Sequence, residues 1–287
     1  MIVGRVREVW RYPVKSMMGE SLPGAEVDAG GIPGDRAWAV RDEVRGGIRG
    51  AKKIAALMRC SASYPEPPTR ARVAPPQIVL PDGGRLMANQ PDAAARVSAA
   101  IEHEVTLWPL LPPDALDHYR RGAPDHAEPI QELRAIFGRT PDEPLPDFAV
   151  FPRELFEYES PLGTYFDAYP LHVLTTATLA RLAKDAPQSA VDVRRFRPNF
   201  VIETAPGLEG YIEAGWAGRK LRVGGLAVEA TIACPRCVMV THGFADLPKD
   251  PGILRAIVRA ASQNVGLYAR PTGAAQVAVG DPVELLD

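Results

Sequence analysis

The stretch TIACPRCVMVTH (Thr231–His242) places two of the chain's three cysteines, Cys234 and Cys237, inside an apolar and β-branched run. Val, Ile and Thr are typical of strands, so the run predicts a β-strand that continues through VMVTH. A C-x-x-C pair can be half of a zinc site, a redox disulfide, or the source of one thiolate for a single metal ion. The remaining sequence has to decide among these uses.

Structural zinc and thioredoxin-type chemistry both fit the sequence poorly. A structural zinc site needs four ligands, but Cys60 is far from the pair and the histidines show no H-x3–5-H spacing. A thioredoxin-type pair lies where a strand meets a helix, whereas here we expect the strand to continue. A further interpretation leaves Cys234 and Cys237 as small, buried hydrophobic residues.

The bulk composition is that of an ordinary soluble globular protein. The chain has 287 residues, 46% of them hydrophobic and 24% charged. This length suits two lobes or one elaborate β-rich unit. A net charge of −2 gives no support to nucleic-acid binding, which requires a clear basic excess.

The cysteine count and the N-terminus bear on location. Three cysteines, an odd number, argue against a secreted disulfide scaffold and favour a reducing compartment. The opening residues, MIVGRVREVWRYPVKS, lack the uninterrupted apolar core of a signal peptide. No run approaches the roughly 18 to 20 apolar residues of a membrane-spanning helix. We therefore expect a cytoplasmic protein without membrane insertion.

Short strands dominate the first third of the sequence. Twenty-nine prolines and 25 glycines divide the chain into short elements. Strands are expected at VGRVREVWRYPV, DRAWAVRD, QIVL, RLMA and EVTLWPL, and one helix at residues 91–102. This pattern indicates a small barrel or sandwich. The expected fold class is mainly β with a few helices (α+β).

Residues 109–152 differ from their surroundings because they are proline-dense and only weakly periodic. A connection of this length without structure of its own is expected to be functional or mobile. We therefore divide the chain into residues 1–110, a proline-rich connection at 111–150, and residues 151–287. The long loops of the connection could shape the mouth of a substrate site.

The last part of the chain alternates strands with two predicted helices. Thr175 or Thr176 can cap a helix that buries Leu179 and Leu182. A second helix over DPGILRAIVRAASQN places Ile253, Leu254, Ile257 and Val258 on one face. Strands are expected at LHVL, FVIET, KLRV, LAVEATIAC, VGLYARP and DPVELL.

Three basic turns could present donors to an anion. YPVKSM carries Lys15 and Ser16, GIPGDRAW carries Arg36, and RRFRPNF carries Arg197 and Asn199. The helix start in TTAT would add backbone N–H groups. Surface Lys and Arg residues beside turns are mostly just solvated, so each turn alone is weak evidence.

In this order, YPVKSM, GDRAWAV, RRFRPNFVI and ACPRCVMVT resemble the MOSC family, the domain named after the molybdenum cofactor sulfurase C-terminus. The layout is also similar to the mitochondrial amidoxime-reducing component and its bacterial relatives. The resemblance covers nearly the whole chain. It implies a β-barrel-like MOSC domain packed against an N-terminal β-barrel domain.

The resemblance also implies a molybdopterin cofactor and a site. Cys237 matches the metal ligand and catalytic cysteine of the amidoxime reducers, and Cys234 would be a neighbour. The soft thiolate suits molybdenum, and the charge of Arg236 is expected to raise the thiolate fraction of Cys237. The resemblance assigns Lys15, Ser16, Arg36, Thr175, Thr176, Arg197 and Asn199 to the cofactor, and Arg236 and Cys237 complete the expected cofactor-binding set.

The implied function is an oxidoreductase that reduces a small N-hydroxylated substrate, or a related N–O or S–O compound, by oxygen-atom transfer. Three cysteines cannot supply an Fe–S cluster beside a cysteine ligand to molybdenum, so electrons would come from a separate donor protein. The alternative is a carrier of the cofactor, or of sulfur as a persulfide on Cys237. A third possibility is a protein of MOSC shape that binds no metal.

Overall fold

A closed barrel organises the fold. In the computed structural model, which describes residues 1–286, the largest sheet has eight strands. Because β11 also pairs with β1, seven of them close into a barrel, and β2 extends it from β1. The order is β11 (Phe200–Thr204), β10 (Leu171–Thr175), β14 (Asn264–Pro271), β13 (Leu226–Pro235), β12 (Lys220–Val223), β16 (Pro282–Leu286), β1 (Ile2–Arg11) and β2 (Glu20–Leu22).

Buried apolar side chains of the strands fill the barrel. In β1, Val3, Val6 and Val9 are buried, and they join the same core as Phe200 and Ile202 of β11. Each barrel strand thus directs one set of apolar side chains inward. The predicted fold class, mainly sheet with a few helices, is confirmed.

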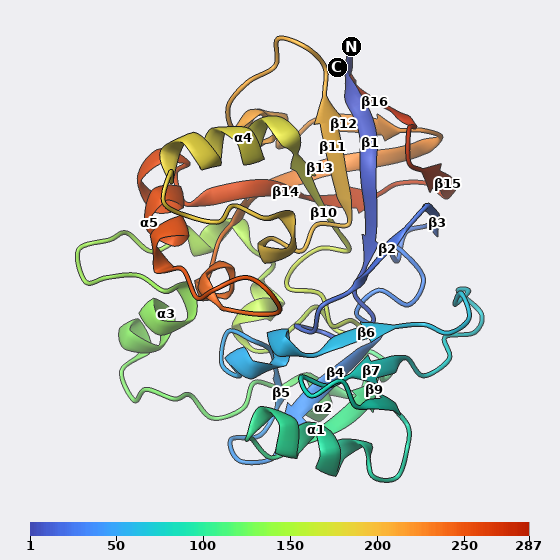
Figure 1. The fold of residues 1–287 in the computed structure, drawn as a ribbon, viewed down its shortest axis with the longest axis vertical. Coiled ribbons are helices and arrows are strands. Elements are labelled where there is room, and N and C mark those ends of the chain that lie inside the picture. Colours follow the sequence, from blue (N-terminus) through green and yellow to red (C-terminus); the bar gives the residue numbers. More distant parts are fainter. Residues whose placement is uncertain (287) are drawn as a thin grey trace.

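The first strand pairs with strands from the last third of the chain. β1 pairs with β11 and β16, so the two chain ends meet at one end of the barrel (Figure 1). In addition, β3 (Gly24–Val27) pairs with β15 (Ala275–Ala278). The division into residues 1–110, 111–150 and 151–287 stays a prediction. In the structure, β1 and β3 of the first part pair with strands of the last part.

Two small sheets form the other half of the molecule. One contains β5 (Ile48–Arg49), β4 (Trp38–Asp42) and β9 (Val105–Pro109). The other contains β6 (Ser61–Ser63), β7 (Gln77–Val79) and β8 (Arg85–Met87). The helix predicted at residues 91–102 is confirmed as α1 (Ala93–Ile101), which follows these strands and buries Val97 and Ile101. The short 3-10 helix η1 (Ala55–Arg59) completes this half.

Two helices flank the barrel on one side (Figure 1). α4 (Thr176–Asp185) provides the crossover that the parallel pair β10 and β11 requires. α5 (Pro251–Ala260) buries Ile253, Leu254 and Ile257 as predicted, while Val258 is only partly buried. The short 3-10 helices η4 (Val193–Arg195) and η5 (Ile212–Trp216) lie in the connections between these elements.

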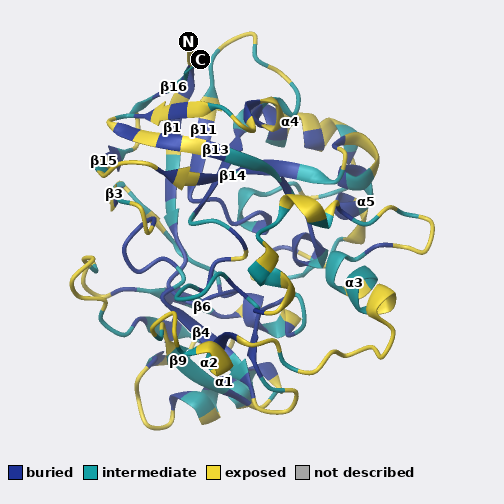
Figure 2. Ribbon diagram, turned by 180° about the vertical axis from the view of Figure 1, so that it is seen from behind, coloured by how far each residue is buried: buried dark blue, intermediate teal, exposed yellow. Residues whose placement is uncertain are grey.

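The connection at residues 111–150 has more structure than its sequence indicated. It contains α2 (Leu116–Tyr119), α3 (Pro129–Phe137) and η2 (Phe148–Val150), and η3 (Arg153–Phe156) follows. The expectation of an unstructured connection was wrong because proline is well accommodated in the first turn of a helix, where Pro129 lies, and Gly138 ends α3 with a φ of 61°. Figure 2 shows that α3 is far more exposed than the barrel strands.

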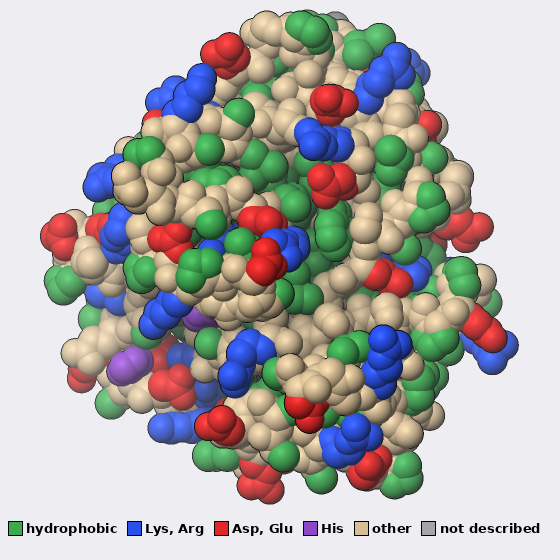
Figure 3. Space-filling view, viewed as in Figure 1, with side chains coloured by type: hydrophobic (Ala, Val, Ile, Leu, Met, Phe, Trp, Pro, Cys, Tyr) green, Lys and Arg blue, Asp and Glu red, His purple; other side chains and the backbone are tan. Residues whose placement is uncertain are grey.

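The surface carries no dominant sign of charge on the face drawn in Figure 3. Lys and Arg side chains are interspersed there with Asp and Glu, in keeping with the net charge of −2. Among the described residues, no helix combines the length and the apolar character needed to cross a bilayer.

Thr175 caps α4, and this contact supports a prediction. Its hydroxyl oxygen accepts a hydrogen bond from the Thr178 backbone N–H and donates one to the buried Glu213 carboxyl group. Thr175→Ala is expected to lower the free energy of unfolding by about 1 to 2 kcal/mol, because the cap and the contact to Glu213 are lost. Urea unfolding measures this, and Thr175→Ser should retain most of the stability. An unchanged stability of Thr175→Ala would contradict this structural role.

Candidate functional site

The three basic turns share an unusual backbone. Ser16, Arg36 and Arg197 have φ values of 69°, 48° and 56°, in the left-handed region that non-glycine residues rarely adopt. Such conformations cost about 1 kcal/mol or more each and cluster at functional sites. Each turn that the sequence singled out therefore holds one strained residue.

A buried tyrosine and a buried aspartate join the turns. The guanidinium carbons of Arg36 and Arg197 lie 4.9 Å and 4.2 Å from the centroid of the Tyr12 ring. Asp35 accepts hydrogen bonds from the Tyr12 backbone N–H (2.7 Å) and from Asn199 Nδ2 (3.0 Å). Sequence reasoning missed Tyr12 and Asp35, although both stand inside motifs it quoted, YPVKSM and GDRAWAV.

Two of these turns, those of Arg36 and Arg197, line one side of a cavity of about 590 Å³, a size typical of ligand pockets. Five of the predicted site residues line it, namely Arg36, Arg197, Asn199, Arg236 and Cys237. The same cavity is lined by four residues that sequence reasoning missed: Lys52, Asp167, His172 and Tyr268. Lone residues of these types carry no sequence signal, because only the fold brings them to the cavity.

Lys15 and Ser16 support the cavity from behind and do not line it. The buried Lys15 ammonium donates to the Tyr165 carbonyl (2.8 Å) and to Asp167 (3.3 Å), which also binds Lys52 (3.0 Å). Burial would raise the pKa of Asp167, but Lys52 and Lys15 outweigh it and hold that pKa well below its usual range. Ser16 Oγ accepts the Ala51 N–H at 2.8 Å and so positions the loop that carries Lys52.

Thr175 and Thr176 lie at the start of α4 and do not line the cavity either. Thr176 Oγ1 is 3.1 Å from Thr204 Oγ1, which ties the helix to β11. Together with the Thr175 cap, this contact gives both threonines a structural role in positioning the helix.

The backbone around the cysteines differs from the predicted strand. β13 ends at Pro235, and Val238–Thr241 forms a 3-10 helix, η6, with Cys237 at its N-terminal boundary. The expectation that VMVTH continues the strand was wrong. Proline lacks an N–H and so ends the strand pairing, and the Thr241 hydroxyl donates to the Val238 carbonyl to close the new turn. Cys237 therefore lies on a tight turn at the cavity.

Arg236 contacts the other cysteine. Its Nη1 lies 2.9 Å from Cys234 Sγ, and its Nη2 donates to the Phe196 carbonyl. The expected effect of the Arg236 charge on the thiolate fraction of Cys237 stays a prediction, because this contact involves Cys234. Burial raises the pKa of the Cys234 thiol, and the Arg236 charge only partly opposes this. Cys234 is therefore a buried thiol that helps to place the arginine.

Two buried guanidinium groups keep free donors beside Cys237. Arg197 Nη2 and Arg236 Nε are buried and have no hydrogen-bond partner among the described residues. Burial, and then the charge of Arg36, lower the pKa of Arg197 to about 10, so it remains charged at neutral pH. Buried polar groups are normally satisfied. The donor set therefore fits an anionic, acceptor-rich group such as a pterin phosphate, with Cys237 as a soft ligand in the same cavity.

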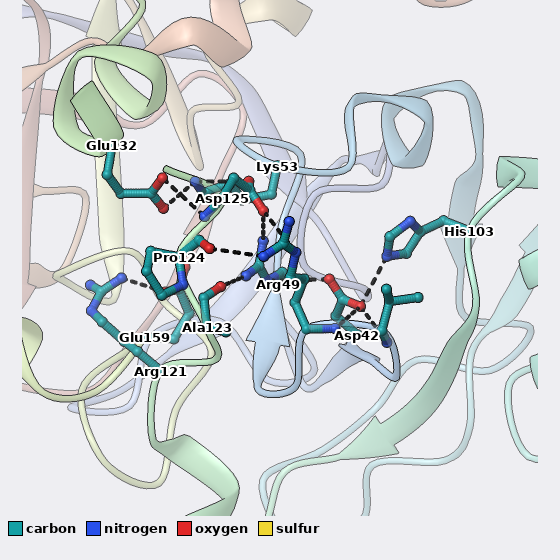
Figure 4. Close-up of polar contacts among 12 residues, drawn as sticks. Asp42, Arg49, Lys53, His103, Arg121, Ala123, Pro124, Asp125, Glu132 and Glu159 are labelled. Atoms are coloured by element: carbon teal, nitrogen blue, oxygen red, sulfur yellow. Dashed lines mark hydrogen bonds and ion pairs between the residues drawn. The ribbon is translucent and has the colours of Figure 1, made fainter. Parts of the chain in front are cut away.

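A network of charges holds residues 121–132 against the small sheet beside β5 (Figure 4). Arg49 lies 3.0 Å from Asp125 and 3.2 Å from Asp42, and it also donates to the Ala123 carbonyl. Lys53 binds Asp125 (3.0 Å) and also Glu132, the latter on α3. Arg49, Lys53 and Glu132 line the cavity, so the network forms part of its wall.

This network predicts a pH dependence of stability. Burial would raise the pKa of Asp125, but hydrogen bonds from Lys53 and Arg49 outweigh it and lower that pKa. A lowered folded-state pKa means that the stabilisation is present above the unfolded value, about 3.9, and is lost as pH falls through the folded value. Asp125→Asn should cost about 1 kcal/mol at pH 7 and almost nothing near pH 2, as measured by urea unfolding.

The exposed Asp114, which belongs to no ion pair among the described residues, provides a control. Asp114→Asn should leave the pH profile unchanged. A cost of Asp125→Asn that is the same at both pH values would contradict the role assigned to the network.

Comparisons with known proteins match both halves of the chain. The MOSC domain model matches residues 163–284, and the model of the MOSC N-terminal beta barrel domain matches residues 3–104. Mitochondrial amidoxime reducing component 2 of Bos taurus is 27% identical over 98% of this chain and 83% of its own length. Mitochondrial amidoxime-reducing component 1 of Mus musculus is 26% identical over 99% of this chain and 83% of its own length.

Proposed function

Because the chain belongs to the MOSC family, with a MOSC N-terminal β-barrel before the MOSC domain, we propose that it binds the molybdenum cofactor and reduces N-hydroxylated compounds. Relatives named amidoxime reducing components support the reductase assignment. The observation that carries the proposal is the pair of unpartnered arginine donors, Arg197 Nη2 and Arg236 Nε, in the cavity that holds Cys237.

Named residues divide the work of holding the cofactor. Cys237 would ligate molybdenum through its thiolate, and Arg36, Arg197, Asn199 and Arg236 would hold the pterin and its phosphate. When bound, the cofactor supplies the two-electron chemistry that breaks the N–O bond. The remaining residues proposed for the site, Lys15, Ser16, Thr175 and Thr176, would act through the elements they position.

The protein's own contribution is preorganisation. Tyr12 and Asp35 fix Arg36, Arg197 and Asn199 before any ligand arrives, so little conformational entropy is lost in ordering them. The burial of Arg197, Asn199, Arg236 and Cys237 keeps bulk water from this end of the cavity. Electrostatic contacts are stronger in such surroundings.

The balanced reaction requires a reductant from outside the chain. A hydroxylamine or amidoxime takes up two electrons and two protons, its N–O bond breaks, and the amine or amidine leaves with one water. We propose a separate electron-donor protein as the source, and a cytoplasmic location.

The carrier alternative, with a persulfide on Cys237, requires that a partner protein reach the sulfur. Cys237 is only 9% exposed and lies within the cavity, which favours a small-molecule substrate over transfer between proteins.

The test is to express the chain in a cofactor-producing host and to measure molybdenum and turnover. About one molybdenum per chain, with reduction of an amidoxime by a viologen reductant, is the expected result. A fully loaded protein that reduces no N-hydroxylated compound would overturn the reductase and leave the carrier.

A further inference from the structure

One part of the cavity is apolar, in contrast to the part that carries Arg197, Arg236 and Asn199. Six side chains from residues 133–155 line the cavity there, and we call them the apolar wall: Leu133, Ile136, Phe137, Phe148, Phe151 and Leu155. They come from α3, from η2 and η3, and from the segments beside these elements. This wall faces the same cavity as Cys237.

The side chains of the apolar wall are not fully buried by packing against the rest of the protein. All six side chains are only partly buried, and α3 contributes no fully buried residue. Among the described residues, only Phe137 of the six packs against a hydrophobic core. The Phe137 and Phe148 rings meet edge to face, with their centroids 5.5 Å apart. Apolar surface that remains open in a pocket is typical of a ligand site.

The wall is held next to the cysteine turn. Arg139, which follows α3, donates from Nη2 to the Arg236 carbonyl (3.0 Å) and from Nε to Gln263 (3.1 Å). The backbone at Gly138 leaves so little room that an added Cβ would lie 3.3 Å from Val238 Cα. The end of α3 therefore touches the residues on both sides of Cys237.

The cavity thus has two chemically different ends. Its buried end carries Arg197, Arg236 and Asn199, which match an anionic cofactor. Its partly exposed end carries aromatic and aliphatic side chains, which offer no hydrogen bond or charge to a phosphate. An apolar organic group bound beside Cys237 would bury the side chains of the apolar wall.

We propose that the apolar wall binds an aromatic substituent of the substrate, so that the enzyme prefers aryl N-hydroxy compounds to short alkyl ones. The inference rests on the proposed function, because the N–OH group has to lie toward Cys237. The apolar wall would then set specificity, while the cofactor and the buried end perform the reduction.

The chain offers a matched pair of variants on one helix. Ile136 lines the cavity, whereas Ile130, also on α3, is 51% exposed and does not line it. The cofactor-loaded enzyme should reduce benzamidoxime with a kcat/KM at least tenfold above that for acetamidoxime. Ile136→Ser should lower this ratio several-fold, mainly through the KM for benzamidoxime, and Ile130→Ser should leave it unchanged.

A binding measurement separates this inference from the reductase itself. Benzamide carries the phenyl group but has no N–O bond, so calorimetry on the loaded enzyme reports the apolar wall alone. Weaker binding of benzamide to Ile136→Ser than to Ile130→Ser would support the role of the apolar wall, even if the enzyme reduces no amidoxime. Failure to reduce any amidoxime would contradict the proposed function but not the role of the apolar wall. Equal use of both amidoximes, or equal benzamide binding by the two variants, would overturn the inference.

Discussion

Cys237→Ser is expected to reduce the molybdenum content of the purified protein to background, whereas Cys234→Ser should retain most of it. Cys237 lines the cavity, while Cys234 lies behind it at 1% exposure, against Arg236. A serine hydroxyl is a harder ligand than a thiolate and is not ionised at neutral pH, so it cannot replace the sulfur. Elemental analysis of both variants from the same host measures the effect.

A folding control accompanies this comparison. Thermal unfolding of the metal-free forms should show that Cys237→Ser is folded, because the change is nearly isosteric. Equal loss of molybdenum from both variants would contradict a single cysteine ligand. It would favour a role in which Cys234 and Cys237 act together, as two ligands of one metal ion or as a redox pair.

Arg197→Ala is expected to weaken cofactor retention roughly 10- to 100-fold while the protein stays folded. Hydrogen bonds from a charged group are worth about 1.5 to 3 kcal/mol, and Arg197 Nη2 has a free donor in the cavity. The rate at which molybdenum is lost during dialysis measures retention. Full retention in the variant would remove Arg197 from the site.

Arg195, two residues earlier, is the matched control. It is also buried, but its side-chain nitrogens donate to the carbonyls of Ala190, Val240, His242 and Pro248. Arg195→Ala should therefore lower the free energy of unfolding by about 3 to 5 kcal/mol, because four buried acceptors lose their donor. The two arginines should thus separate stability from cofactor binding in one short segment.

Local pattern was enough to predict most strands and three of the turns at the site. β-Branched and aromatic residues predicted β1, and the apolar face of α5 predicted that helix, because both signals depend on neighbours in sequence. The turn residues Ser16, Arg36 and Arg197 could be singled out because charged or polar groups beside proline and glycine mark exposed backbone donors and side chains. None of this required knowledge of which strands pair.

Local pattern failed where long-range contacts decide. α3 was missed because it lies in a proline-dense segment and, among the described residues, only Phe137 of its apolar residues packs against a hydrophobic core. The strand expected after Cys237 is instead η6, because Pro235 ends the pairing. The contact between Arg236 and Cys234 Sγ was not foreseen. The direction of a side chain at a turn depends on the backbone dihedral angles, which the spacing of residues in the sequence does not reveal.

The amino-acid sequence was sufficient to predict a mainly β chain that resembles the MOSC family, with a cysteine and several basic turns as its chemical groups. The three-dimensional structure was needed to show that β1 closes the barrel, that Tyr12 and Asp35 bring the turns together, and that the apolar wall lines the same cavity as the buried charges. The physical reason is that strand composition records burial, while closure and cavity shape depend on contacts between residues far apart in the chain.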